Sequence, residues 1–220
     1  MKPIPQGHWR PDAAQTALLQ AALLPGEAAA AAWLCWNPSL RLDTVDLGAY
    51  RLLPLVAENL RQQAGGGLPE LGRITGIQRR HWYANQLLFQ QIHPLLAQLQ
   101  VMGVPVLLLK GMALALTVYP NSGLRPMEDV DILVPTHQAA DVLLWMLRWG
   151  WRPSRPLPLQ HLEAFLWCAS SAELIGPQGG KCDLHWRLFP QPLDWNADQP
   201  FWQAARPLVW RGLTLQCLDP

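Results

Sequence analysis

The chain has little charge. Only 15% of its 220 residues are charged, and the formal net charge is +1. Proteins that bind phosphate backbones carry clustered Lys and Arg, so the lack of a basic excess argues against a nucleic-acid partner. Half of the residues are hydrophobic, which is the composition of a folded protein rather than a disordered one. The length suits one compact domain, or a small domain with a helical annex.

Cysteines and long apolar runs are also scarce. The four cysteines are widely spaced and form no CxxC pair, which argues against a zinc site and against a disulfide framework. Residues 1–12 contain prolines and charges but no apolar stretch of the kind that signal peptides carry. The longest apolar run, Val104–Leu109, is too short to span a bilayer. We therefore expect a cytoplasmic protein without a membrane span.

Tryptophan, in contrast, is abundant, with 12 copies. Its large apolar area and single N–H donor indicate a role in the core and in groove walls. Stacking on nucleic-acid bases is a second possibility, but the tryptophans lack the basic neighbours that such binding uses.

The first hundred residues predict helices. Apolar residues recur at helical spacing, and Pro25-Gly26 marks a break. The predicted helices are Ala13–Leu24, Glu27–Trp36, Val45–Gln63 and Leu71–Val101. We interpret residues 1–102 as a helical region that packs on the part that follows.

The pattern changes at Gly103, where short apolar runs alternate with turn signals. The predicted strands are Val104–Leu109, Val130–Val134, Phe165–Ile175 and Lys181–Leu188, with a hairpin turn at 176–180 and a second small hairpin at Arg211-Gly212. The predicted helices are Met112–Tyr119, His137–Trp149 with Thr136 as its cap, and a short one near Phe201. These elements predict an α+β fold, in which residues 103–220 form a small mixed sheet flanked by helices.

Two carboxylates open one of these strands. Side chains alternate along a strand, so Asp129 and Asp131 point to one face while Val130 and Ile132 point to the core. Residues two apart on a strand lie about 6.5–7 Å apart, so their carboxylates can converge on a pair of metal ions. Mg²⁺ is commonly held by one or two carboxylates together with substrate phosphates. Taken alone, an Asp-x-Asp pair is common in solvated loops and helix caps.

The context of this pair adds weight to a metal site. Before it, Lys110-Gly111 joins a strand to a helix, where a glycine lets the backbone approach a phosphate and Lys110 offers a positive charge. The simpler interpretation is a tight turn beside a solvated lysine. Arg125 precedes the pair by four residues, and it either holds a carboxylate ionised or clamps a phosphate.

A third carboxylate follows on a later strand. In Lys181-Cys182-Asp183-Leu184-His185, alternation places Asp183 and His185 on one face. Asp183 is a candidate metal ligand and a candidate base for an attacking hydroxyl. His185 is a possible substrate contact or orients Asp183, although a lone histidine is more often structural.

These residues resemble the nucleotidyltransferase superfamily that includes DNA polymerase beta. More narrowly, the run LLLKGMALALTVYPNSGLRPMEDVDILV followed by DLHWRL resembles the bacterial family of uncharacterised nucleotidyltransferases. The resemblance is close over Gly103–Leu188. It implies transfer of a nucleoside monophosphate from an NTP, with Mg²⁺, to a hydroxyl of a small molecule or protein. It implies Asp129, Asp131 and Asp183 as metal ligands, and Lys110 and Gly111 as the phosphate turn.

The sequence departs from the family pattern in two places. Met112 follows the turn glycine, where the wider superfamily usually has Ser or Gly. Relatives also continue with further helices beyond the position of Leu218–Pro220. The second departure supports an alternative function, a catalytically impaired protein that acts as a binding module. Retention of all three acids argues against it, because an idle group of like charges destabilises a fold.

Overall fold

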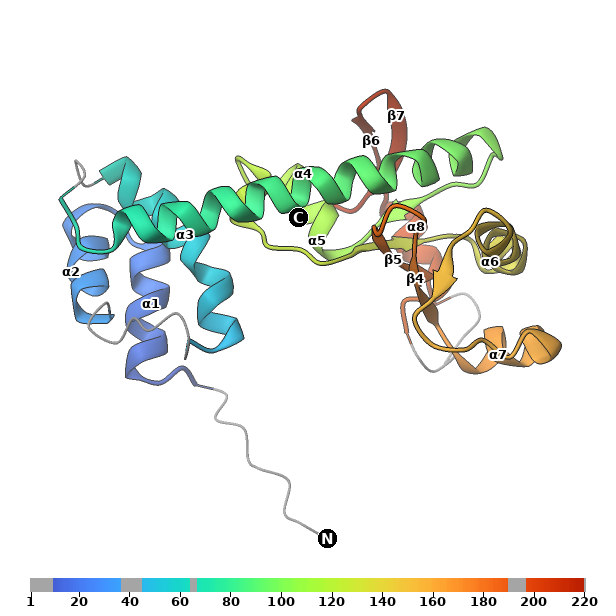
Figure 1. Ribbon diagram of the computed structural model, residues 1–220, viewed down its shortest axis with the longest axis horizontal. Coiled ribbons are helices and arrows are strands. Elements are labelled where there is room, and N and C mark those ends of the chain that lie inside the picture. Colours follow the sequence, from blue (N-terminus) through green and yellow to red (C-terminus); the bar gives the residue numbers. More distant parts are fainter. Residues whose placement is uncertain (1–9, 37–44, 64–66, 190–196, 220) are drawn as a thin grey trace, which may run out of the picture. The chain divides into compact units, whose positions relative to one another are not determined.

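The computed structural model describes residues 10–36, 45–63, 67–189 and 197–219 (Figure 1). The chain divides into two compact units, and the division falls within one long helix. The first unit extends to Trp82 and includes Gly123–Arg125, and the second contains Tyr83–Ser122 and the residues from Pro126 onward. Each unit has its own hydrophobic core.

The first unit is helical, as predicted. It contains α1 (Ala13–Leu23), α2 (Gly26–Trp36), α3 (Leu47–Gln63) and the first part of α4 (Leu71–Val101). Asp12 and Gln15 form a capping box that satisfies free backbone N–H groups at the start of α1. Buried apolar side chains from all four helices fill the core, among them Leu18, Ala21, Trp33, Leu53, Leu60 and Ile74.

The second unit contains a mixed sheet. Within the described residues its seven strands follow the order β3-β4-β5-β2-β1-β7-β6. Strands β2 and β5 are parallel, as are β1 and β7, and the other neighbours are antiparallel. The strands are β1 (Leu107–Leu108), β2 (Val130–Leu133), β3 (Arg152–Pro153), β4 (Ser171–Ile175), β5 (Lys181–His185), β6 (Arg206–Trp210) and β7 (Leu213–Cys217). The predicted α+β class is confirmed.

The two faces of this sheet differ in what covers them. On one face, the side chains of Val130, Ile132 and Leu184 belong to the larger hydrophobic core. The helices that contribute to this core are the second part of α4, α5 (Lys110–Thr117) and α6 (Ala139–Arg148). On the other face, Leu107 and Leu133 pack with α8 (Gln199–Ala204) in a small cluster. Because side chains alternate along each strand, the acids of β2 and β5 point to this second, less covered face.

The predicted strand Val104–Leu109 is shorter than expected. Val104 and Val106 are buried, but only Leu107 and Leu108 form β1. The following helix also begins earlier than predicted, at Lys110 instead of Met112. Lys110 and Gly111 therefore belong to the first turn of α5. Lys110 directly follows Leu109, whose backbone N–H donates to Asp131 O of β2.

The predicted strand Phe165–Ile175 is wrong in its first half. The chain forms η4 (Leu159–His161) and then α7 (Leu162–Cys168), and only Ser171–Ile175 is a strand. Two side chains from the segment after β5 satisfy the carbonyls at the end of α7. The indole of Trp186 donates to Leu166 O and Ala169 O, and the Arg187 guanidinium donates to these two carbonyls and to Trp167 O. These contacts are distant in sequence, so local periodicity does not report them.

The predicted cap at Thr136 is also wrong. Thr136 begins a short 3₁₀ turn, η3 (Thr136–Gln138), and its hydroxyl donates to Trp186 O at 2.6 Å, so it ties this turn to the segment after β5. The helix α6 starts at Ala139. Its end at Gly150 is confirmed, since that glycine adopts the left-handed conformation with φ of +87°.

Both predicted hairpins are confirmed. Strands β4 and β5 pair around the glycine-rich turn, which is closed by a hydrogen bond from Gly176 N to Gly180 O. Strands β6 and β7 pair around Arg211 and Gly212, both in the left-handed region (Figure 1). A further 3₁₀ turn, η2 (Ser122–Leu124), precedes β2. In the part of the chain that is described, no helix combines the length and apolarity needed to cross a membrane.

Candidate active site

Asp131 and Asp183 lie opposite each other on neighbouring strands. They are register partners in the parallel pair β2 and β5, so both side chains leave the sheet on the same face. The side chains are largely buried, with 8% of Asp131 and 20% of Asp183 exposed. Two carboxylates at this spacing repel each other unless a cation lies between them.

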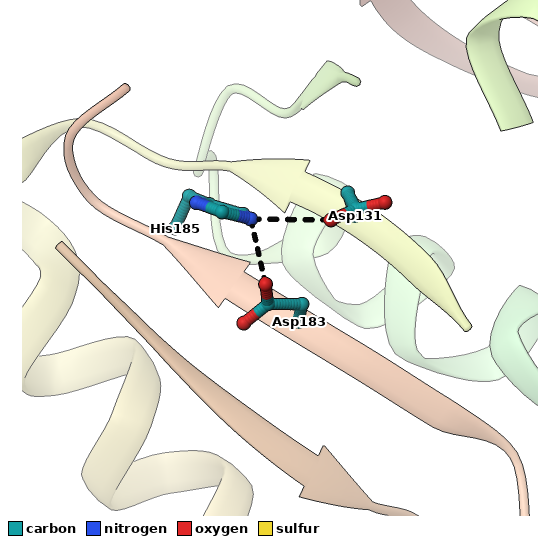
Figure 2. A group of neighbouring side chains, drawn as sticks. All are labelled: Asp131, Asp183 and His185. Atoms are coloured by element: carbon teal, nitrogen blue, oxygen red, sulfur yellow. Dashed lines mark hydrogen bonds and ion pairs between the residues drawn. The ribbon is translucent and has the colours of Figure 1, made fainter. Parts of the chain in front are cut away.

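His185 supplies the positive group in this structure. Its Nε2 atom lies 2.9 Å from Asp183 Oδ2 and 3.2 Å from Asp131 Oδ1, between the two acids (Figure 2). Burial alone lowers the pKa of His185, but the hydrogen bonds to Asp131 and Asp183 outweigh burial and raise it to about 9. Burial likewise raises the pKa of each acid, but hydrogen bonds from His185, together with the nearby charge of Lys110, outweigh burial, so both pKa values lie below the ordinary one.

Lys110 contacts the same acid from α5. Strand β1 runs antiparallel to β2, and Leu109 N donates to Asp131 O. The next residue, Lys110, takes a left-handed conformation with φ of +45°, which is uncommon for a residue with a Cβ atom and typical of functional sites. Its Nζ donates to Asp131 Oδ1 at 2.5 Å and lies 3.5 Å from His185 Nε2. The lysine side chain is 58% exposed.

Gly111 serves close packing in this turn. The positive φ falls on Lys110 and not on the glycine. A Cβ atom added to Gly111 would lie 3.0 Å from the Met127 side chain, and the glycine is buried. The structure thus explains the glycine by the approach of Met127, while its predicted contact with phosphate stays a prediction.

Asp129 precedes β2 and is half-buried. Burial raises its pKa, and the negative charges of Asp131 and Asp183 raise it further, which places this carboxyl in the electrostatic field of the pair. Among the described residues, the group whose ligand atoms all lie within 4.8 Å of one another is, however, Asp131, Asp183 and His185. A metal-ligand role for Asp129 stays a prediction, as does the nucleotide-binding role of Arg125, which lies half-buried in the bend before β2.

The model of the uncharacterised nucleotidyltransferase family matches residues 47–220. The chain belongs to this family. The match begins at the start of α3, well before the segment Gly103–Leu188 whose motifs resemble the family most closely, so α3 and α4 are part of the family's common region. No curated protein and no solved structure matches the chain significantly.

A pocket of about 400 Å³ adjoins Asp183. Its floor is the paired strands β4 and β5, where Glu173 is the register partner of Asp183. The Ser171 hydroxyl hydrogen-bonds Asp183 and contributes to its lowered pKa. The walls are formed by the segment Ser154–Leu157 and by Phe165 of α7. Pockets of this volume suit a small-molecule group.

The sequence did not single out Ser171 or Glu173. Both lie on the strand paired with β5, at alternate positions, and Glu173 is exposed. Buried and exposed side chains alternate over residues 171–175, and this alternation could have placed Ser171 and Glu173 on one face. The predicted strand began at Phe165, so the alternation was not recognised. The negative charge of Glu173 also contributes to the raised pKa of Asp129, so Glu173 interacts electrostatically with the carboxylates of the site.

The donor set fits a divalent cation. Two carboxylate oxygens and one imidazole nitrogen converge within 4.8 Å, and the ammonium of Lys110 and the ring of His185 now balance the charge that a bound cation would balance. Carboxylates that are held ionised on a rigid sheet are suitable metal ligands.

Proposed function

We propose that this protein transfers a nucleoside monophosphate from an NTP to a hydroxyl of a small molecule or a protein, with Mg²⁺. The observation that carries the proposal is the register of Asp131 and Asp183, which brings two carboxylates together on one face of the sheet. Family membership supports nucleotidyl transfer as the reaction class.

In this proposal Asp129, Asp131 and Asp183 hold two ions. Bound Mg²⁺ would neutralise triphosphate charge and lower the pKa of a coordinated hydroxyl. The Lys110 side chain is exposed, and its ammonium exchanges its contact with Asp131 for a phosphate oxygen of the NTP. Gly111 and Arg125 contribute to nucleotide binding.

Asp183 acts on the acceptor. The acceptor hydroxyl enters through the pocket beside Asp183 and forms a bond to the α-phosphorus of the NTP. The bond from that phosphorus to the bridging oxygen of pyrophosphate breaks, and pyrophosphate leaves with the bonding electron pair. Asp183 takes the hydroxyl proton, consistent with its carboxylate being held ionised.

Label transfer tests the proposal. The protein is incubated with each α-³²P-labelled NTP, Mg²⁺ and cell extract, and the expected result is a labelled product that disappears with EDTA. Asp131→Asn should abolish both the product and Mg²⁺-dependent NTP binding. Asp141→Asn on the exposed side of α6 is the matched control, since it makes the same chemical change outside the site.

Two results separate the proposal from the alternative. NTP affinity that is unaffected by EDTA and by Asp131→Asn would contradict it. Absence of NTP binding, together with capture of a protein partner that is lost on deleting residues 1–100, would instead favour a binding module.

A further inference from the structure

The three donor atoms that converge in the site are not all oxygens. Asp131 Oδ1 and Asp183 Oδ2 contribute oxygen, and His185 Nε2 contributes nitrogen (Figure 2). We propose that one of the ion positions is a mixed nitrogen and oxygen site, ligated by His185 as well as by both acids, and that it binds Mn²⁺ in preference to Mg²⁺. This inference rests on the proposed function only in assuming that the acid group binds a divalent cation.

The spacing of the donor atoms fits one coordination shell. In an octahedral shell with bonds of about 2.1 Å, neighbouring ligand atoms lie about 3.0 Å apart. His185 Nε2 lies 2.9 Å from one acid oxygen and 3.2 Å from the other, so both of these distances match the spacing of neighbouring ligands. When the ion binds, it displaces the Nε2 proton of His185 to solvent and replaces the Lys110 ammonium beside Asp131 Oδ1, so the ion takes over the charge balance of these two cations. The three donor atoms then face a common ion.

The backbone holds the histidine in this position. His185 follows Asp183 by two residues on β5, and it is the register partner of Leu133 on β2, so strand pairing fixes its direction. The residue is 9% exposed. A histidine so enclosed on the acid face has few conformations in which Nε2 avoids the two carboxylates.

The chemistry of the donor selects the ion. Mg²⁺ is a hard cation that takes oxygen ligands and retains water, whereas an imidazole nitrogen favours first-row transition metals. Mn²⁺ takes carboxylate and water ligands as Mg²⁺ does, and as a first-row transition metal it binds an imidazole nitrogen more readily than Mg²⁺ does. It also supports phosphoryl chemistry. A position with two carboxylates and one imidazole thus favours Mn²⁺, while a position built only from carboxylates and phosphates suits Mg²⁺.

Electron paramagnetic resonance of bound Mn²⁺ tests the ligation directly. The full chain is titrated with Mn²⁺ alone, and echo-envelope modulation is recorded on the bound ion. We expect ¹⁴N modulation from one imidazole, replaced by the ¹⁵N pattern when the protein is grown with ¹⁵N-histidine. This labelled wild-type sample needs no substitution, so the test does not depend on a variant folding.

Two variants locate the nitrogen. His185→Gln should remove the modulation and weaken Mn²⁺ binding at least tenfold, with less than threefold change for Mg²⁺. His93→Gln is the matched control, because His93 lies on α4, where Nε2 is 3.2 Å from Arg211 O, and should leave the modulation intact.

The metal-binding measurements and the label-transfer assay can succeed or fail independently of each other. Bound Mn²⁺ without nitrogen modulation would overturn the inference, and so would equal affinities for Mn²⁺ and Mg²⁺ in the wild type. If label transfer occurs in either case, the proposed function stands. Nitrogen modulation in a protein that transfers no label would support the metal site and contradict the proposed reaction.

Discussion

Asp131 on β2 and Asp183 on β5 are direct register partners across a parallel strand pair. Their carboxylates are brought together by backbone hydrogen bonding, not by flexible loops, and His185 Nε2 lies between them. A site built on paired strands keeps its donor atoms in place before any ligand binds, which favours metal and phosphate binding.

Lys110→Met should weaken NTP binding while leaving the fold intact. The methionine keeps an unbranched apolar chain but removes the ammonium that reaches Asp131. Loss of a charge-assisted contact with phosphate costs about 1.5–3 kcal/mol, so we expect the Kd for NTP to rise by roughly 10- to 100-fold. Isothermal titration calorimetry measures the effect, and Arg148→Met at the exposed end of α6 should leave the Kd unchanged.

Asp129→Asn should stabilise the metal-free protein and impair its function. Burial and the charges of Asp131 and Asp183 disfavour the ionised form of Asp129, so a neutral side chain of the same shape removes repulsion. In EDTA we expect Tm to rise by about 2–4 °C, the shift that about 1 kcal/mol produces in a chain of this size. Label transfer should fall to background. A lower Tm in EDTA would contradict the electrostatic account.

Gly180→Ala should destabilise the packing of the β4–β5 hairpin against α4. An added Cβ atom would lie 2.7 Å from Cβ of Gln91, an atom that cannot move without the helix backbone. Overpacking of this kind costs about 1–3 kcal/mol, measured as a shift in the urea midpoint. Gly72→Ala is the control, since nothing lies within 4 Å of its added atom and alanine favours helix. Equal effects of the two substitutions would show that the contact with Gln91 is unimportant.

Glu58 should make the stability of the first unit depend on pH. Burial raises the pKa of Glu58, but hydrogen bonds from Gln78, Gln62 and Arg61 outweigh burial, and the pKa in the fold lies below 4.5. A lowered pKa stabilises the fold above the ordinary value, and this stabilisation is lost as the pH falls through the folded pKa.

Hydrogen exchange of the α3 amides between about pH 7 and about pH 4 measures this dependence, after correction for the intrinsic exchange rate. Protection should decrease at the acid end in the wild type. Glu58→Gln should have lower protection at neutral pH and a smaller change on acidification. If acidification lowers the protection of the α3 amides as much in Glu58→Gln as in the wild type, Glu58 is excluded as the cause.

Some elements of the fold were predictable because their signals are local. The helix Leu71–Val101 has apolar residues at regular helical spacing over many turns, and the structure confirms both its bounds. The hairpins at 176–180 and at Arg211-Gly212 were predictable because glycine marks the turns. The segment Phe165–Cys168 was not predictable as helix, because its end is satisfied by Trp186 and Arg187 from a distant part of the chain.

The sequence by itself determined the residue types of the site and their spacing along two strands. Alternation placed Asp131 on one face of its strand and placed Asp183 and His185 together on one face of theirs, because the side-chain period of a strand is fixed at two residues.

Only the tertiary structure decided that these strands pair in parallel with Asp131 opposite Asp183, and that Lys110, in a left-handed conformation, reaches the same acid. Strand order and register follow from contacts across the whole sheet, which no local pattern encodes. For the same reason, the position of the imidazole between the two carboxylates became evident only from the fold.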